Sequence, residues 1–389
     1  MIDLNSYLNV VNKKVIEKNV DEAFNNQISK NALIIDIREP DEINSGSPTN
    51  AIRISKGMLE MQIGQIVSNP EIELFIMCAA GKRSLIASYS LIQMGYKNVF
   101  SVKGGFNAWK NKSLPFEIPK KLNSEDFERY KRNILVPEVG EKGQLKLLNS
   151  KILIVGAGGI GSPVALYLAA TGIGTLGIID DDIVDKTNLQ RQILHSEKSV
   201  GKSKVMSAKK RISELNSQIN VIEYNKRITK ENIEIIISNY DIVIDGTDNF
   251  NTRYLINDAC VKLKIPNIHG SVFLFEGQFT TFWPSSKVED APCYRCLYPL
   301  PPPPEIAPSC AEAGVLGVLP GLIGVLCATE AIKIILGLEN MVGKLMVYNA
   351  LSMDFETYKV ENNKNCEYCG CQGTEKYPEY SDYSESCTI

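Results

Sequence analysis

Over its first third, the chain alternates short apolar runs with stretches of helical character. The runs Leu33-Ile-Ile-Asp36 and Leu74-Phe-Ile-Met77 are almost entirely apolar. Continuous apolar runs of this length are typical of strands that are covered on both faces of a parallel sheet. The pattern therefore predicts an α/β domain with a parallel sheet over residues 1–119.

A second series of apolar runs begins after residue 120. Lys151-Ile-Leu-Ile-Val155 opens it, a glycine-rich turn and a helix follow, and further runs occur at Leu176–Asp180 and Asp241–Asp245. Strands that alternate with helices in this way are typical of a doubly wound sheet. We predict a doubly wound, Rossmann-like α/β domain over residues 120–371.

Segments of different composition lie between and after these domains. Pro115–Ser124 contains two prolines and predicts a linker, with a helix starting at Ser124. Pro301–Pro304 is a candidate for the stiff polyproline II conformation. Residues 372–389 are polar and have little to bury, which predicts a disordered tail.

One uncharged stretch, Ala313–Thr329, is rich in Val, Leu, Ile and Gly. It is short for a membrane span, which needs about 20 apolar residues. It also contains Pro320 and leads directly into Glu330 and Lys333. These features favour a buried core helix or a dimer-interface helix, so we expect no membrane association.

Composition and charge narrow the class of protein. The 389 residues are 44% hydrophobic and carry a formal net charge of −3, which favours a globular protein of about two domains without a nucleic-acid or anionic-membrane partner. The N-terminus does not resemble a secretory signal. Four of the ten cysteines form two C-x-x-C pairs, which favours metal binding and thiol chemistry over disulfides. We therefore expect a cytoplasmic protein.

Cys78 stands at the end of an apolar strand and is followed by Ala79-Ala80-Gly81-Lys82-Arg83-Ser84. A thiol between a strand and a helix N-terminus faces free backbone N–H groups. These groups, with Lys82 and Arg83, favour a thiolate or persulfide anion. The alternative is a buried structural cysteine.

A glycine-rich turn follows the first strand of the second domain. Gly156, Gly158, Gly159 and Gly161 let the backbone approach phosphate at a helix N-terminus. Asp180 ends the next strand, where a carboxylate can hold ribose hydroxyls. These residues alone fit NAD as well as ATP.

Residues further along the chain favour ATP. The segment Asn188-Leu-Gln-Arg191-Gln192 and Lys204 supply cations, which an adenylating enzyme needs to neutralise its pyrophosphate leaving group. Asp248 and Asn249 follow another strand, and the carboxylate there can hold Mg²⁺ near the α-phosphate.

Two C-x-x-C pairs predict a structural zinc site. Cys293, Cys296, Cys366 and Cys369 provide four thiolates, the ligand set of a closed tetrahedral zinc knuckle. Cys371 lies close enough to compete as a ligand. The alternative for either pair is a redox dithiol.

The loop at Cys78 resembles the C-x-x-G-x-R-S active loop of the rhodanese sulfurtransferases. The resemblance covers most of residues 1–120 and includes Asp36-Ile-Arg-Glu-Pro40 and Lys103-Gly-Gly-Phe-Asn-Ala-Trp109. It implies that Cys78 carries sulfur as a persulfide held by Arg83 and the loop amides. Four residues separate Cys78 from Arg83, whereas related phosphatase loops have five. Gly46-Ser47-Pro48 replaces the Gly-His-Ile segment that rhodaneses often have.

The second domain resembles the MoeB/ThiF family, which is related to ubiquitin-activating enzymes. The match runs from about residue 125 to 371 and rests on these segments: Arg129-Tyr-Lys-Arg132, Gly156–Gly161, Asp180, Asn188-Leu-Gln-Arg-Gln192, Lys204, Thr247-Asp-Asn249 and Pro292-Cys-Tyr-Arg-Cys296. It implies that Asp180 binds ribose, that Arg191 and Lys204 bind the triphosphate, and that Asp248 organises Mg²⁺. By the same resemblance, both C-x-x-C pairs bind zinc.

The resemblance also implies two features of the assembly and the chemistry. Arg132 would reach the γ-phosphate of the partner subunit's ATP, which makes the working unit a homodimer. Cys310 follows the proline run and lies in a loop that passes near the active site in this family. A mobile thiol there can attack an acyl-adenylate or join a disulfide with the substrate protein.

Together the two resemblances imply one function. The protein would adenylate the C-terminal carboxylate of a ubiquitin-like sulfur carrier of the MoaD/ThiS type, and the rhodanese persulfide would then supply sulfur for a thiocarboxylate. A cysteine desulfurase or a small molecule would load Cys78. Molybdopterin synthesis, thiamin synthesis and tRNA thiolation all use this chemistry. An NAD-dependent oxidoreductase and a non-catalytic scaffold for sulfur carriers are the alternatives.

Overall fold

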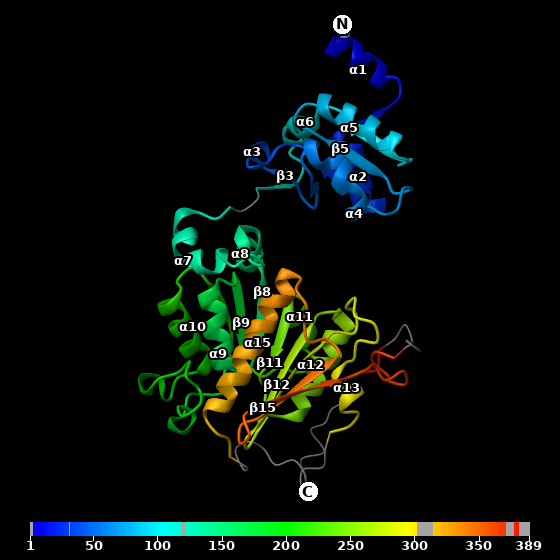
Figure 1. Ribbon diagram of the computed structural model, residues 1–389. Helices are drawn as coiled ribbons and strands as arrows, with labels where there is room; N and C mark the ends of the chain where they lie inside the picture. The colour runs from blue at the N-terminus through cyan, green and yellow to red at the C-terminus, as the bar shows by residue number, and fades with distance from the viewer. Residues whose placement is uncertain (1–2, 31, 119–120, 302–313, 371–376, 381–389) are drawn as a thin grey trace. The chain divides into compact units, whose positions relative to one another are not determined.

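The computed structural model forms two compact units, residues 1–121 and residues 122–389. Each unit is an α/β fold built on a largely parallel sheet, as the apolar runs predicted (Figure 1). The structure describes residues 3–30, 32–118, 121–301, 314–370 and 377–380.

The first unit contains a five-stranded sheet in which all neighbouring strands are parallel. The predicted runs Leu33–Asp36 and Leu74–Met77 form two adjacent strands near its centre, β2 and β5. Their side chains are almost completely buried, which explains why both runs lack polar alternation. In spatial order the strands are β1 (Ile16–Lys18), β6 (Val99–Val102), β5, β2 and β4 (Ile52–Arg53).

Helices cover both faces of this sheet and pack against its apolar side chains. They are α2 (Val20–Lys30) and α6 (Gly105–Asn111) on one face and α4 (Leu59–Ile66) and α5 (Lys82–Gln93) on the other. Helix α1 (Leu4–Asn12) packs on α5, and the unit also contains the short helices α3 (Pro40–Ile43) and η1 (Lys56–Met58).

The segment predicted as a linker takes part in the first unit. Its residues Phe116–Glu117 form strand β7, which pairs antiparallel with β3 (Ser47–Pro48). Phe116 also packs edge-on against Phe106, with ring centroids 5.6 Å apart. The linker prediction is therefore wrong for these residues, because a pairing partner nearly 70 positions earlier recruits them into the fold.

The second unit is built on an eight-stranded sheet. Five strands are parallel, in the order β10 (Asn220–Tyr224), β9 (Thr175–Ile179), β8 (Lys151–Val155), β11 (Ile242–Asp245) and β12 (Asn267–Phe273). The chain leaves β8 toward β9 on one side and returns to β11 on the other, which makes the β8–β11 boundary the switch point of a doubly wound fold. Three antiparallel strands complete the sheet, β13 (Glu276–Phe282), β14 (Lys344–Asn349) and β15 (Asp354–Lys359).

The helices of the second unit begin at Ser124, as predicted. Asn123 and Asp126 form a capping box that satisfies free backbone N–H groups at the start of α7. The helices are α7 (Ser124–Ile134), α8 (Gly140–Asn149), α9 (Gly161–Thr171), η2 (Lys186–Asn188), η3 (Glu197–Ser199), α10 (Lys204–Leu215), α11 (Ile233–Ile237), α12 (Phe250–Leu263), α13 (Tyr294–Leu297) and α15 (Val318–Leu336).

Helix α15 is the one helix of the described chain that is long and apolar enough to span a membrane. It packs along α9, β12 and β13, and it crosses the sheet beside α9 (Figure 1). Ile323, Cys327 and Ala331 on this helix are completely or almost completely buried. The helix is therefore part of the core of the second unit, one of the two roles predicted for it.

The tail that was predicted to be disordered lies largely outside the described residues. Residues 377–380 are described, and the Tyr380 hydroxyl donates a hydrogen bond of 2.8 Å to Glu234. Lys262 binds the same carboxylate and lies 5.7 Å from the centre of the Tyr380 ring. Around Tyr380, the prediction of disorder is wrong because aromatic and ionic contacts hold the chain. Most of the candidate polyproline segment, residues 302–304, also lies outside the described residues.

Candidate functional site

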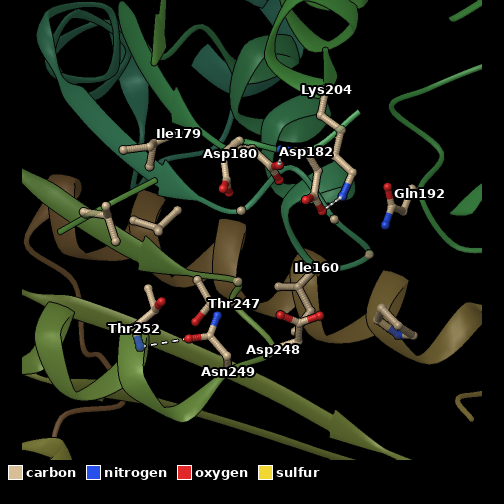
Figure 2. A pocket seen from close by; sticks show the side chains of 18 of the residues that line it. Ile160, Ile179, Asp180, Asp182, Gln192, Lys204, Thr247, Asp248, Asn249 and Thr252 are labelled. Atoms are coloured by element: carbon tan, nitrogen blue, oxygen red, sulfur yellow. Dashed lines mark hydrogen bonds and ion pairs between the residues drawn. The ribbon is translucent and has the colours of Figure 1, made fainter. Parts of the chain in front are cut away.

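A cavity of about 310 Å³ opens at the carboxyl ends of β8, β9 and β11. This is the switch point of the sheet, where doubly wound folds bind their ligands. In Figure 2, Asp180, Asp182 and Lys204 lie on one side of the cavity and Thr247, Asp248 and Asn249 on the other. The polar residues lining it are Asp180, Asp181, Asp182, Arg191, Gln192, Lys204, Lys226, Arg227, Thr247, Asp248, Asn249, Thr252 and Arg253.

The glycine-rich turn combines packing with open space. Gly156 has a φ of +94°, which side chains rarely adopt, and a Cβ on Gly161 would lie 1.9 Å from the carbonyl oxygen of Gly156. By contrast, a Cβ on Gly158 would meet only the amide of Gln192, at 3.8 Å. Gly156, Gly158 and Gly159 line the cavity. Gly161 is required for close packing of the turn, and its contact with the cofactor stays a prediction.

Asp180 connects the end of β9 to the glycine turn. One carboxylate oxygen accepts a 2.8 Å hydrogen bond from the Ala157 N–H, and the other accepts a 2.9 Å bond from the Asp182 N–H. Burial raises the pKa of Asp180, and nearby Lys204 opposes this shift. The carboxylate lines the cavity beside the glycine turn, where the sequence placed a ribose-binding group.

The predicted cations are brought to the same wall. Lys204 is buried and its Nζ lies 2.7 Å from the carboxylate of Asp182, a partner that the sequence analysis missed. Arg191 lines the cavity and donates a 3.3 Å hydrogen bond to the Thr187 carbonyl. Gln192 also lines the cavity.

Two residues of the predicted nucleotide set lie away from the cavity wall. Asn188 is not among the lining residues. Its side chain instead accepts a 3.1 Å hydrogen bond from the Asp185 N–H and caps the short helix η2. Arg132 is exposed near the end of α7 and does not line this cavity either. The role of Asn188 in nucleotide binding stays a prediction; in this structure the residue shapes the turn that carries Arg191.

The opposite wall presents Asp248. Its carboxylate is exposed and has no hydrogen-bond partner among the residues that the structure describes. Asn249 follows it and caps α12 by accepting a 2.9 Å bond from the Thr252 N–H. A carboxylate with unused acceptor oxygens at this edge can serve as a ligand for a divalent cation.

Three cations at the cavity were missed by the sequence analysis. Lys226 and Arg227 follow β10, and Arg253 lies in the first turn of α12. Arg253 donates hydrogen bonds of 2.9 and 3.3 Å to the Thr247 carbonyl. None of the three belongs to a recognisable motif. The available signal was their position after a parallel strand: Lys226 and Arg227 follow β10 directly, and Arg253 lies in the first turn of the helix that follows β11.

Cys78 lies in the first unit between β5 and α5. Its sulfur accepts a 3.1 Å hydrogen bond from the Gly81 N–H and lies 3.5 Å from the Ser84 hydroxyl. Only 1% of the residue is exposed. The amide contact is the one predicted for a sulfur anion at a helix N-terminus.

Arg83, predicted to hold the persulfide, has a different partner here. Its guanidinium makes a two-pronged ion pair with the carboxylate of Glu42, at 2.7 and 2.5 Å. The hydrogen bond from Arg83 is the largest cause of the lowered pKa of Glu42. No hydrogen bond joins Arg83 to Cys78 in the described chain. Glu42, which the sequence analysis missed, therefore holds the arginine beside the loop.

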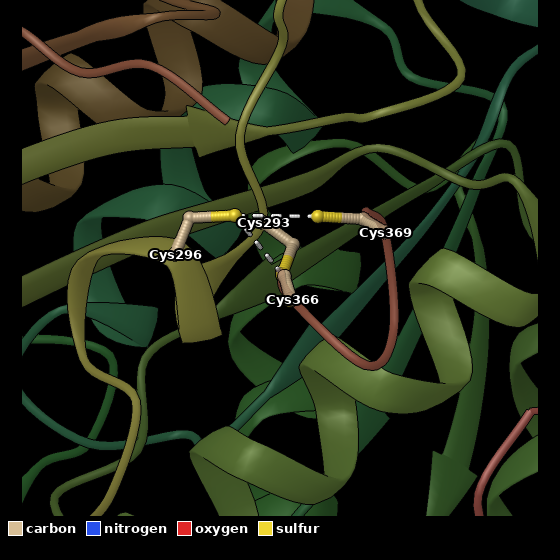
Figure 3. A group of neighbouring side chains, drawn as sticks. All are labelled: Cys293, Cys296, Cys366 and Cys369. Carbon is tan, nitrogen blue, oxygen red and sulfur yellow. Dashed lines mark hydrogen bonds between the residues drawn. The ribbon is translucent and has the colours of Figure 1, made fainter. Parts of the chain in front are cut away.

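The two C-x-x-C pairs come together on α13 and the segment after β15. The sulfurs of Cys293, Cys296, Cys366 and Cys369 face one another (Figure 3). Three of the sulfur–sulfur distances are 3.8 Å (Cys293 to Cys296), 3.6 Å (Cys293 to Cys366) and 3.3 Å (Cys296 to Cys369). A tetrahedral zinc ion with bonds of about 2.3 Å requires sulfurs about 3.8 Å apart. All four sulfurs lie within 4.8 Å of one another. The cluster therefore fits a closed zinc site. Cys371 and Cys310 lie outside the described residues.

Elemental analysis is expected to find one zinc per chain. The change Cys366→Ser is expected to remove most of the metal and to lower the melting temperature. It breaks the link that the metal makes between chain segments about 70 residues apart. Cys260→Ser, at a buried cysteine away from the cluster, should keep the zinc. Wild-type protein that contains no zinc when purified without chelators would refute the site.

Fold and sites together define a class of protein: a nucleotide-binding doubly wound domain with a four-cysteine knuckle, preceded by a small sulfurtransferase-like domain. Residues 130–371 match the model of the ThiF family, and residues 19–112 match that of the rhodanese-like domain. The chain belongs to the ThiF family and carries an N-terminal rhodanese-like domain.

Curated relatives support the same assignment. The chain is 45% identical over 269 residues to the SAMP-activating enzyme E1 of Haloferax volcanii, covering 69% of this chain and 97% of the relative. It is 44% identical to the sulfur carrier protein adenylyltransferase of Thermus thermophilus, covering 68% and 98%. It is 43% identical to the probable adenylyltransferase/sulfurtransferase MoeZ of Mycobacterium tuberculosis, covering 71% and 69%.

Solved structures that resemble the chain include those of a microcin C7 biosynthetic enzyme. The crystal structure of E. coli MccB with ATP matches with a TM-score of 0.55 at 27% identity, covering 64% of this chain and 75% of that one. The structure of the microcin C7 biosynthetic enzyme MccB with N-formylated MccA matches with the same score at 26% identity, covering 68% and 80%.

Proposed function

We propose that this protein uses ATP to adenylate the C-terminal carboxylate of a ubiquitin-like sulfur carrier and then exchanges the adenylate for sulfur. The main support is the cavity at the switch point, which combines an open glycine turn, a buried carboxylate and several cations. Relatives named as activators of sulfur-carrier proteins share this part of the chain. The cavity and the loop at Cys78 supply the groups for the two halves of the reaction.

In the first half, the carrier carboxylate attacks the α-phosphorus of ATP and pyrophosphate leaves. Asp180 holds the ribose hydroxyls, and the amides of the glycine turn contact phosphate. Arg191 and Lys204 neutralise the triphosphate. Asp248 would hold Mg²⁺, which when bound would supply further charge stabilisation. Lys226 and Arg227 add positive charge to the same cavity.

In the second half, a persulfide on Cys78 supplies the sulfur. Its terminal sulfur attacks the acyl carbon and AMP leaves, which joins carrier and Cys78 through an acyl disulfide. Two electrons from external thiols then cleave the sulfur–sulfur bond and release the thiocarboxylate. The Gly81 amide at 3.1 Å stabilises the sulfur anion. Cys310 provides an alternative acceptor for the acyl group before sulfur transfer.

The proposal includes a homodimeric assembly, a structural zinc ion and a cytoplasmic location. Arg132 reaches the γ-phosphate of ATP in a second copy, so the working unit is a homodimer, and its exposure on α7 leaves it accessible to a partner. Zinc at the four cysteines is structural, because no ligand position is left for water. Thiol chemistry of this kind needs the reducing conditions of the cytoplasm.

Intact-mass measurement of the carrier tests the proposal directly. The protein is incubated with ATP, Mg²⁺, a persulfide donor and a purified MoaD- or ThiS-type carrier. We expect a carrier species with one oxygen replaced by sulfur, formed only when ATP and donor are both present. A carrier that lacks its last glycine serves as the control. Absence of both the acyl-adenylate and the thiocarboxylate with every carrier type would refute the proposal.

A further inference from the structure

A buried carboxylate lies directly behind the cavity wall that carries Asp248. Asp245 is the last residue of β11 and is completely buried. Its Oδ1 accepts hydrogen bonds from the Thr247 N–H at 3.0 Å and from the Thr247 hydroxyl at 2.6 Å. One oxygen of Asp245 thus fixes the residue that precedes Asp248.

The other oxygen of Asp245 faces His269. The distance from Oδ2 to His269 Nδ1 is 2.9 Å, and the two residues are register partners on the adjacent strands β11 and β12. Burial lowers the pKa of His269, so its imidazole is neutral at pH 7. Because a carboxylate only accepts, Nδ1 must carry the proton. His269 thus satisfies the half of the buried carboxylate that Thr247 does not reach.

The imidazole is held in place by aromatic rings. Tyr294 packs edge-on against it with ring centroids 5.2 Å apart, and the ring of Phe282 lies 6.0 Å away. Tyr294 stands between Cys293 and Cys296, and its N–H donates a 2.8 Å hydrogen bond to Asn257 on α12. The ring of His269 is thereby confined by Tyr294 and Phe282, which limits the positions that its Nδ1–H can take.

Thr247 is held from the opposite side as well. Its carbonyl accepts a 2.9 Å hydrogen bond from Arg253, while its N–H and hydroxyl are bound to Asp245. The next side chain, Asp248, has no hydrogen-bond partner in the described chain. Its direction into the cavity therefore depends on the backbone at Thr247, and the path of support runs from His269 through Asp245 to that backbone.

We propose that His269 is a positioning residue, which through Asp245 fixes Thr247 and so sets the position from which Asp248 acts. The consequence for catalysis rests on the role proposed above for Asp248. His269 touches neither the nucleotide cavity nor the reacting atoms, since it does not line the cavity. Its effect is transmitted through its hydrogen bond to Asp245 and the two hydrogen bonds from Thr247 to the same carboxylate.

Two readouts on three variants test this inference in the full-length protein. His269→Leu removes the Nδ1–H, and His269→Asn keeps an N–H donor at the corresponding place. Tyr240→Phe, the control, removes a part-buried 3.0 Å hydrogen bond to Tyr224 at the end of β10. We expect His269→Leu to lower kcat for carrier-dependent ATP–pyrophosphate exchange about 10- to 100-fold, with KM for ATP changed less than about threefold. His269→Asn and Tyr240→Phe should stay close to wild type.

The second readout does not depend on catalysis. Amide hydrogen exchange over residues 246–253 should accelerate in His269→Leu and not in the other two variants, because the Thr247 N–H loses its fixed acceptor. Normal amide exchange and normal kcat in a folded His269→Leu protein would overturn the inference, as would equal losses in His269→Asn. If His269→Leu does not fold, Thr247→Val is the deciding variant, because it removes only the 2.6 Å hydrogen bond from the Thr247 hydroxyl to Asp245. It should lower kcat while ATP binding is retained. An unchanged kcat in Thr247→Val would overturn the inference.

Failure of the two proposals can be told apart. Wild-type protein that shows no carrier-dependent exchange would remove the proposed function. The amide-exchange comparison would still show whether His269 fixes the backbone before Asp248. Conversely, an active wild type with an unaffected His269→Leu variant would remove only the positioning role.

Discussion

Asp248→Ala is expected to abolish carrier-dependent ATP–pyrophosphate exchange and to leave the fold intact. The carboxylate is exposed at the cavity and has no hydrogen-bond partner within the described ranges, so its removal breaks no contact that stabilises the domain. Loss of a group that stabilises developing charge typically lowers a rate about 10²- to 10³-fold. Radioactive pyrophosphate exchange and a thermal melt measure the two expectations.

Arg191→Ala supplies a second test of the same cavity from its opposite wall. It should also abolish exchange, because the departing pyrophosphate would lose a cation. Asp354→Ala is the matched control for Asp248→Ala. It removes an aspartate carboxylate from the exposed strand β15 at the edge of the sheet, and this variant should show normal exchange. Near-normal exchange in both Asp248→Ala and Arg191→Ala would show that the adenylation site is elsewhere.

Cys78→Ser is expected to eliminate thiocarboxylate formation while leaving ATP–pyrophosphate exchange at the wild-type level. A serine hydroxyl cannot form a persulfide, but it fits the buried position and can accept the Gly81 N–H. Since the proposed adenylation site lies in the second unit and Cys78 in the first, the two activities should separate completely. Intact-mass analysis of the carrier and pyrophosphate exchange on the same preparation measure both.

Cys260→Ser is the matched control for this experiment. Burial raises the pKa of the Cys260 thiol, and the side chain lies in the apolar core beside β11, so it has no access to a sulfur donor. Thiocarboxylate yields should be unchanged. A Cys78→Ser protein that still produces thiocarboxylate from the donor at the wild-type rate would exclude Cys78 as the sulfur carrier.

The elements that were predictable from sequence are the ones buried on both faces. Leu33–Asp36, Leu74–Met77 and Lys151–Val155 coincide with β2, β5 and β8, because a parallel strand between two helical layers tolerates few polar residues. The run Leu176–Asp180 is displaced by one residue from β9. Asp180 leaves the strand because its carboxylate turns to bind the Ala157 N–H.

Other features depend on contacts between distant segments and could not be read from local pattern. The strand at Phe116–Glu117 exists because Ser47–Pro48 offers an edge. The ion pair of Arg83 with Glu42 joins positions 41 residues apart. In the same way, the motif residues at the nucleotide cavity could be predicted from the sequence. Lys226 and Arg253 could not, because they line the cavity only as a result of the order of the strands in the sheet.

The buried carboxylate of Glu330 has a consequence for the nucleotide cavity ten residues away. Although it lies in the apolar helix α15, it accepts hydrogen bonds from the Thr281 hydroxyl and the Met341 N–H and pairs with Lys333. Of these partners, Thr281 lies on β13, so its hydrogen bond ties the helix to the sheet. Because Pro320 in the first turn of α15 lines the cavity, about 15 Å of helix from Glu330, the helix that this acid anchors to β13 is also the one that forms part of the cavity wall.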